Sequence, residues 1–295
     1  MSARVNPQSM SSRTQDWVRL TKPGIVVTNV MMVAVGLWLA PDAVSLGTAL
    51  GALLGTGCLV AACGAFNQFI ERDTDALMAR TSTRPLPAGR CEPSEALVIG
   101  GLGIAGGIWL LAALTSALTT LLGVAAVFVY VVLYTPMKRW TAWSIPVGAV
   151  AGALPPVIGW TAVTDSIGAG AIGLFTILFL WQILHFLGIA LYRVDHYESA
   201  GLEVGLGAID PETTIGHVRA ASIGLVLVAA AFVWWLEPSL AFAVCMLVAV
   251  GAPAGQSLSP VTRETASDWG RRVFFASLVT LPILTLGALL GVVIS

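Results

Sequence analysis

The sequence predicts an all-α integral membrane protein, a bundle of nine transmembrane helices around a central cavity open toward the cytoplasmic side. Composition is the first observation, because 57% of the 295 residues are hydrophobic and only 11% are charged, whereas soluble domains carry roughly 25% charge. The second is the grouping of apolar residues into runs near the ~20 residues that a helix needs to cross a bilayer. The third is that the charged residues gather between these runs on one side. We expect one membrane-embedded domain over residues 1–295, with 1–16 as a flexible cytoplasmic segment.

The apolar runs follow one another with few interruptions. They lie at 24–41, 46–69, 94–115, 117–134, 144–162, 168–192, 218–236, 238–256 and 273–294. The joins at 115–117 and 236–238 are short, and Pro238 suits the first turn of a new helix. Four cysteines show no spacing typical of a metal site, so they are read as packing residues.

The distribution of basic residues predicts the orientation. With nine spans, all 15 Lys and Arg residues fall on the same side, whereas the opposite loops contain Asp42, Asp165 and Glu237. Because basic residues stay on the cytoplasmic side, we expect the amino terminus in the cytoplasm and the carboxyl terminus outside. The lack of a transit peptide favours the inner membrane of a bacterium. Nothing in the composition indicates a nucleic-acid partner.

The long polar loops, 70–93, 193–217 and 257–272, are all expected on the cytoplasmic side. A transporter would be expected to carry polar groups on both faces or to have a charge relay inside the membrane. This one-sided arrangement instead indicates an enzyme whose polar substrate portion arrives from the cytoplasm while its apolar portion lies in the bilayer.

A cluster of charged residues directly follows the second apolar run. If the helix continues, Asn67, Glu71 and Asp75 are four residues apart and share a stripe about 80° wide. No lysine is near them in the sequence, so the carboxylates would repel one another unless a cation lies between them. Mg²⁺ is the expected cation, since it takes oxygen ligands and a substrate phosphate completes its shell. Asp73 falls nearly opposite the stripe, and a solvated charged loop is the alternative for the whole segment.

Basic residues near this stripe are candidates for binding phosphate. The planar guanidinium groups of Arg72, Arg80 and Arg84 suit phosphate oxygens. Lys138 follows the fourth run and could reach the same region, and Lys22 opens the first run. For both lysines, a simple anchoring role at the membrane surface is the alternative.

The end of the sixth run carries a second polar stripe. Helical spacing places Trp181, His185, Gly188, Tyr192, Asp195 and Ser199 within about 80° on one face. Such a set is typical of a cavity lining, and a helix–helix seam with His185 hydrogen-bonded to a neighbour is the alternative. Asp195 would lie at the same depth as Glu71 and Asp75, so the two helix ends would form a single diphosphate–Mg²⁺ site.

These motifs together resemble the UbiA-type intramembrane prenyltransferases, in the branch that prenylates heme, over nearly the whole chain. The resemblance is carried by residues 20–23 (LTKP), 67–75 with Arg80-Thr81 and 84–87 (RPLP), Tyr134-Thr135 with Lys138-Arg139, 148–160 (GAVAGALPPVIGW), and Trp181, His185-Phe186 and 195–201. One departure is Asp195-His196-Tyr197, where family members usually carry Asp-Asp-Tyr. It bears on the identity of the acceptor.

The resemblance implies transfer of farnesyl from farnesyl diphosphate to a vinyl group of heme b, with addition of water. Asn67, Glu71, Asp75 and Asp195 would hold Mg²⁺ on the diphosphate, whereas Arg72, Arg80, Arg84, Lys138 and Lys22 would bind its oxygens. His185 and Tyr192 would face the heme. Another acceptor, such as a quinone precursor, and a heme-binding or transport protein without catalysis are the alternatives. A heme A synthase or cytochrome oxidase assembly proteins are possible partners.

Overall fold

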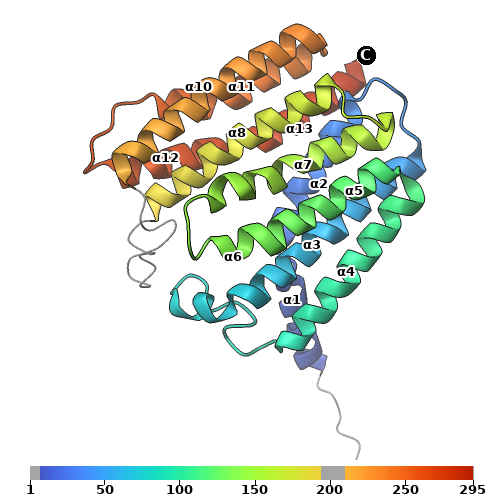
Figure 1. The fold of residues 1–295 in the computed structure, drawn as a ribbon, viewed down its shortest axis with the longest axis vertical. Coiled ribbons are helices and arrows are strands. Elements are labelled where there is room, and N and C mark those ends of the chain that lie inside the picture. Colours follow the sequence, from blue (N-terminus) through green and yellow to red (C-terminus); the bar gives the residue numbers. More distant parts are fainter. Residues whose placement is uncertain (1–6, 194–209, 295) are drawn as a thin grey trace, which may run out of the picture.

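The computed structural model describes residues 7–193 and 210–294, and every regular element in these ranges is helical. The elements in chain order are α1 (Pro7–Leu20), α2 (Pro23–Leu39), α3 (Leu46–Leu77), α4 (Pro93–Leu114), α5 (Ala117–Val127), the π-helix η1 (Phe128–Tyr134), α6 (Thr135–Met137), α7 (Ser144–Thr164), α8 (Ala169–Tyr192), α10 (Pro211–Leu236), α11 (Leu240–Ser257), α12 (Ala266–Leu278) and α13 (Thr280–Ile294). The long helices run side by side, and the long loop after α3 lies at one end of the bundle (Figure 1).

The predicted membrane bundle is confirmed. Eight helices of the described chain are long and apolar enough to cross a bilayer. A ninth span results when α2 is joined to α1 across a bend of 49°. Two of the spans are composite, since α5, η1 and α6 follow one another without a gap and α12 continues into α13. The two short joins are also where the sequence places them, after Leu114 and after Leu236.

Two helices begin earlier than their apolar runs. α10 starts at Pro211 rather than at 218, because the Asp210 side chain accepts a hydrogen bond from the Thr213 N–H at 2.9 Å and Pro211 occupies the first turn. α12 starts at Ala266 rather than at 273. Its first turns are amphipathic and bury Trp269 completely, so hydropathy alone does not detect them.

The segment 1–16, expected to be flexible, includes part of a helix in the described residues. Residues 7–20 form α1, which packs against the ends of α3 and α4. The Trp17 indole N–H donates to Glu95 Oε1 at 2.8 Å, and Leu20 is fully buried. An amphipathic helix with these anchors is stable at the surface of the bundle although it is too polar to span a membrane.

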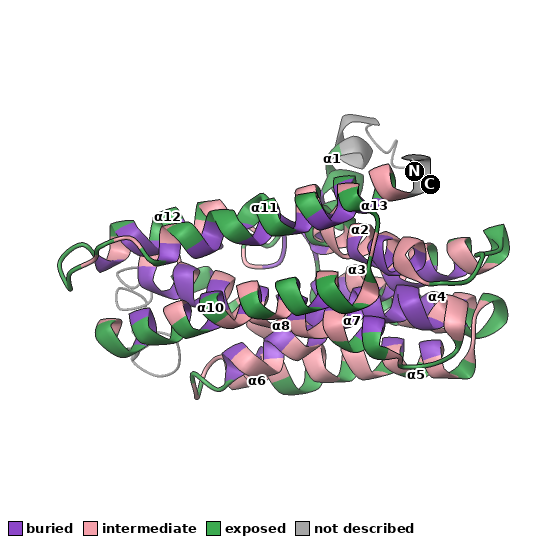
Figure 2. Ribbon diagram, turned by 90° about the horizontal axis from the view of Figure 1, so that it is seen from above, coloured by how far each residue is buried: buried purple, intermediate pink, exposed green. Residues whose placement is uncertain are grey.

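The centre of the bundle is α7, which packs against α2, α5 and α8. In the most apolar stretch of α7, 67% of the residues are buried, compared with 11% for residues 117–137. Figure 2 shows this contrast between inner and outer helices. Two glycines allow α2 and α7 to touch through their backbones, since a Cβ on Gly36 would lie 2.0 Å from the Pro156 carbonyl oxygen and one on Gly159 would lie 2.1 Å from that of Val33.

Candidate active site

The polar end of α3 forms the base of the site. The helix continues through Leu77, well beyond the apolar run, as the stripe of Asn67, Glu71 and Asp75 requires. Asn67 and Asp75 are buried, with exposures of 0% and 2%. The side chain of Asp73 is 82% exposed, which confirms that it points away from the stripe. The helical spacing therefore predicts correctly which faces of α3 are inside and outside.

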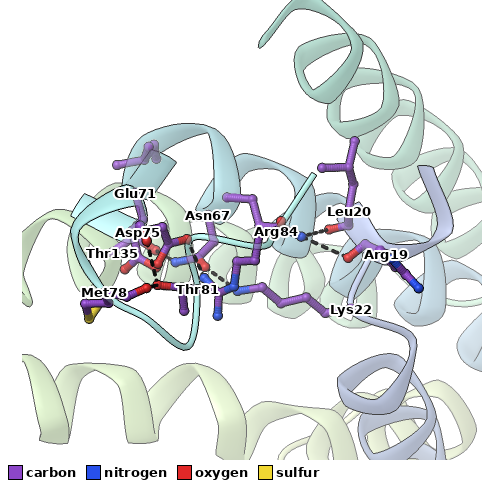
Figure 3. A network of polar contacts seen from close by, with 12 residues as sticks. Arg19, Leu20, Lys22, Asn67, Glu71, Asp75, Met78, Thr81, Arg84 and Thr135 are labelled. Atoms are coloured by element: carbon purple, nitrogen blue, oxygen red, sulfur yellow. Dashed lines mark hydrogen bonds and ion pairs between the residues drawn. The ribbon is translucent and has the colours of Figure 1, made fainter. Parts of the chain in front are cut away.

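Each polar residue of the stripe contacts a cation from a different part of the chain, and Figure 3 shows Lys22 and Arg84 beside the stripe. Lys138 Nζ donates to Glu71 Oε1 at 2.9 Å, Arg84 forms an ion pair with Asp75, and Lys22 donates to the Asn67 side-chain oxygen. Lys138 therefore reaches the region of the stripe as expected, although no lysine is near the carboxylates in the sequence. The two lysines are 45 and 67 positions away in sequence from their partners, so only the packing of the helices brings them here.

Lys22 reaches the site because the chain bends at this residue. It lies between α1 and α2 with φ 53° and ψ 62°, a left-handed conformation that costs a side-chain-bearing residue about 1–3 kcal/mol. The bend is held against α3, where the Gln68 amide donates to the carbonyl oxygens of Arg19 and Leu20 at 2.9 and 3.0 Å. A glycine is required at position 64 of α3, where the bend packs closely, since a Cβ there would lie 2.8 Å from the Thr21 carbonyl oxygen.

Lys138 is positioned by the π-helical segment η1. Widened π turns occur preferentially at functional sites. The Thr135 hydroxyl donates to the Tyr130 carbonyl oxygen at 2.8 Å, five residues back, and accepts from the Asn67 amide at 3.2 Å. Lys138 Nζ lies 4.7 Å from the centre of the Tyr134 ring, a cation–π geometry. Arg139, by contrast, donates to the Ile70 carbonyl oxygen and supports the end of α3.

The loop between α3 and α4 holds Arg84 over the end of the stripe. The Thr81 hydroxyl donates to the Asp75 carbonyl oxygen at 2.8 Å, and buried Leu86 anchors the loop against α1. Arg90 fastens its far end by donating to Asp16 at 3.0 Å. These contacts give Arg84 a defined place beside Asp75.

Of the other two predicted arginines, Arg72 does not face the stripe. Arg72 forms an ion pair with Asp73 at 2.9 Å on the outer face of α3, with 42% of its side chain exposed. Arg80 is exposed on the loop. The sequence places both close to the carboxylates, but the Arg72 side chain pairs with Asp73, which faces away from the stripe.

A cavity of about 340 Å³ extends from the polar cluster into the bundle between α2, α3, η1, α7 and α8. Lys22 and Lys138 line it where it meets the cluster. Apolar side chains dominate the remainder, among them Met32, Leu59, Val60, Ile158 and Leu178. A polar entrance followed by an apolar chamber suits a ligand with a charged head and a hydrocarbon tail.

Part of the second predicted stripe, on α8, lines the cavity, and part packs against α12. Trp181 and His185 line the cavity and stack with ring centres 5.0 Å apart. Tyr192 is not among the described lining residues. It stacks on Phe274 of α12 at 6.2 Å and lies beneath the guanidinium of Arg271. Asp195 falls in 194–209, outside the described residues, so its meeting with Glu71 and Asp75 stays a prediction.

The donor set on α3 fits a hard divalent cation in part. Glu71 and Asp75 supply two carboxylates one turn apart, and Asn67 supplies an amide oxygen on the same face. Such oxygens suit Mg²⁺, which usually takes one or two carboxylates and leaves further positions for phosphate and water. Within the described residues no group of three His, Cys, Asp or Glu side chains could hold a metal. That these oxygens hold Mg²⁺ therefore stays a prediction.

Three residues of the site were given no functional role from the sequence. Thr135 links the stripe to η1, and Tyr130 and Gln182 line the cavity. The four-residue spacing of Tyr130, Tyr134 and Lys138 is the signal that could have indicated a shared face.

Comparison with known proteins gives consistent results. Residues 29–279 match the profile of the UbiA prenyltransferase family. A protoheme IX farnesyltransferase of Sorangium cellulosum is 42% identical over 81% of this chain and 86% of its own length. That of Anaeromyxobacter dehalogenans is 37% identical over 96% and 95%, respectively.

Solved structures show the same fold at low sequence identity. A UbiA homologue of Archaeoglobus fulgidus bound to DMAPP and Mg²⁺ superposes with a TM-score of 0.68 at 17% identity, covering 91% of this chain and 99% of its own. A structure described as digeranylgeranylglyceryl phosphate synthase gives 0.73 at 12% identity, with 94% and 99% covered.

Proposed function

This chain belongs to the UbiA prenyltransferase family, and on that premise we propose that it transfers farnesyl from farnesyl diphosphate to a vinyl group of heme b, with addition of water, to make heme O. The observation that carries the proposal is the continuous path from the cation-rich cluster at Lys22 and Lys138 into the apolar cavity. The relatives of 37–42% identity named protoheme IX farnesyltransferase support this donor and this acceptor.

The cluster would bind the diphosphate. Glu71, Asp75 and the Asn67 oxygen would hold Mg²⁺, with Asp195 as the expected ligand from the end of α8. When bound, Mg²⁺ supplies positive charge that stabilises the diphosphate as it leaves. Lys22, Lys138 and Arg84 contact the metal-binding side chains in this structure. The same three groups would turn toward the phosphate oxygens, where negative charge develops as the C1–O bond breaks.

The cavity would hold the hydrocarbon chain and protect the allylic cation. Its apolar lining, from Val60 and Leu59 to Met32 and Leu178, excludes bulk water until the vinyl carbon attacks C1. His185, with Tyr192 at the end of the same helix, is proposed for the heme side. Tyr192 packs on Phe274 of α12, so its proposed role is to support the heme side of the cavity rather than to line it.

The topology follows from the charge distribution. The cluster lies at the end of the bundle that carries the basic residues, so we place this end, with the amino terminus, in the bacterial cytoplasm and the carboxyl terminus outside. A heme A synthase or a cytochrome oxidase assembly protein would be the natural receiver of the product.

Expression in a bacterium that makes heme b but no heme O tests the proposal. Extracted pigments are separated and weighed by mass spectrometry, and we expect heme O in cells with the intact protein but not in cells with Asp75→Asn. A prenylated aromatic compound in place of heme O would favour a quinone-precursor acceptor. Unmodified heme that copurifies with the protein would favour a binding or transport role and refute prenyl transfer to heme.

A further inference from the structure

One wall of the cavity carries two polar side chains that are not part of the proposed diphosphate-binding cluster. Gln182 and His185 are three residues apart on α8 and both line the cavity. At this spacing two side chains are neighbours, with roughly 5–6 Å between their Cβ atoms. The surrounding wall is aromatic or without side chains, built from Trp181, Tyr134, Phe186, Gly148 and Gly152.

The contacts of His185 determine which ring nitrogen carries the proton. Nδ1 lies 2.8 Å from Ser277 Oγ, and the Ser277 hydroxyl donates its own hydrogen to the Phe274 carbonyl oxygen at 2.6 Å. Since a hydroxyl has a single hydrogen, Ser277 must accept from His185, so the proton is on Nδ1. The ring is held in place by Trp181, which stacks on it and donates to the Ser277 carbonyl oxygen at 2.9 Å.

Nε2 of His185 is therefore an acceptor without a partner among the residues that the structure describes. The carboxamide of Gln182 likewise has no hydrogen-bond partner in the described chain. It sits against Gly152, where an added Cβ would lie 1.7 Å from the amide nitrogen. A polar group in apolar surroundings is unfavourable unless it has a hydrogen-bond partner. The Gln182 carboxamide can donate a hydrogen bond, and His185 Nε2 can accept one. Together they suit a small ligand that can both accept and donate hydrogen bonds.

We propose that Gln182 and His185 hold one water molecule, and that His185 Nε2 accepts the proton of this water as its oxygen adds to the acceptor. The inference rests on the proposed function. In that reaction the terminal vinyl carbon bonds to C1 of farnesyl while the C1–O bond to diphosphate breaks. Positive charge then lies on the vinyl carbon attached to the porphyrin. The water oxygen bonds to that carbon and its proton passes to Nε2, so no oxidant or reductant is needed.

The outcome of the reaction depends on this water. Without it, the same cation is neutralised by losing a proton from the adjacent carbon, which gives an alkene lighter than heme O by one water. The ratio of heme O to this alkene therefore reports on the water site separately from the transfer of farnesyl itself.

Gln182→Met tests the site by removing the amide while keeping the length of the side chain. Gln256→Met is the matched control, because Gln256 lies near the end of α11, donates to the Ser259 hydroxyl and is not part of the described cavity lining. We expect the ratio of heme O to alkene to fall about tenfold or more in the first variant, the scale of one lost hydrogen bond, and to stay unchanged in the second. An unchanged ratio in Gln182→Met would overturn the inference.

A pair of His185 variants separates the proton acceptor from an iron ligand. Asn at this position keeps a donor for Ser277 but lacks Nε2, whereas Gln can reach the Nε2 position. We expect His185→Asn to lower the ratio of heme O to alkene roughly a hundredfold, with an unchanged spectrum of bound heme, and His185→Gln to recover part of it. A heme spectrum that loses an axial nitrogen ligand, together with loss of both products, would overturn the role as proton acceptor.

The same measurements separate this inference from the proposed function. Wild-type protein that forms no prenylated heme at all would refute the proposed function and the water site with it. Wild-type protein that forms heme O, with the same product ratio in the Gln182 and His185 variants, would refute the water site alone.

Discussion

Asp75→Asn tests whether the buried ion pair with Arg84 serves chemistry as well as structure. The substitution keeps the shape of Asp75 and leaves its carbonyl bond to Thr81 intact, but it removes the charge that faces Arg84. The Asp75 side chain is 2% exposed and that of Arg84 is 23% exposed. Because Arg84 keeps some contact with solvent, we expect a loss of stability of about 3 kcal/mol, the lower part of the range for breaking a buried pair.

The loss of activity should exceed what this destabilisation explains. If Asp75 holds Mg²⁺, the rate of prenyl transfer should fall by ~10²-fold or more. Adding Arg84→Gln removes the unpaired cation, so the double variant should recover part of the stability without recovering activity. Asp73→Asn is the matched control, since Asp73 is 82% exposed and its surface pair is worth less than about 1 kcal/mol.

The assay uses purified protein in detergent with farnesyl diphosphate, heme b and Mg²⁺. Product is separated by liquid chromatography, and thermal unfolding is followed by circular dichroism on the same samples. If Asp75→Asn turns over at the wild-type rate, or if the double variant regains activity together with stability, the carboxylate is structural and the metal site must lie elsewhere.

Three further predictions address the metal, the arginines and the packing. Chelation of divalent cations should abolish prenyl transfer, and added Mg²⁺ should restore it; turnover that persists in chelator would contradict the role of Mg²⁺. Arg84→Gln should lower kcat/KM at least about tenfold more than Arg72→Gln, because Arg72 pairs with Asp73 on the outer face of α3; equal losses would mean that Arg72 reaches the substrate. Gly159→Ala should destabilise the protein by about 2 kcal/mol, since the new methyl group meets the backbone of α2, whereas Gly101→Ala on α4 has open space and should be neutral or slightly stabilising in thermal unfolding.

The sequence by itself determined the membrane class, the spans and the inward face of α3. These features depend on local patterns, since the hydropathy of a run and the phase of Asn67, Glu71 and Asp75 on a helix need no information from elsewhere in the chain. The sequence did not predict the first residues of helices that begin with polar residues, as at Pro211 and Ala266. Hydropathy detects apolar content but not helix capping.

Only the tertiary structure decided which side chains meet. Lys138 bonds Glu71 across 67 positions and Ser277 sets the tautomer of His185 across 92. Two local irregularities bring the lysines to the cluster: the left-handed bend at Lys22 and the π-helical turn before Lys138. Both change the direction of the following side chains relative to a regular α-helix. The arithmetic of 3.6 residues per turn holds along α3 but does not describe the bend at Lys22 or the wider turn of η1. Hydrogen bonds from Gln68 and Asn67 on α3 support both irregularities.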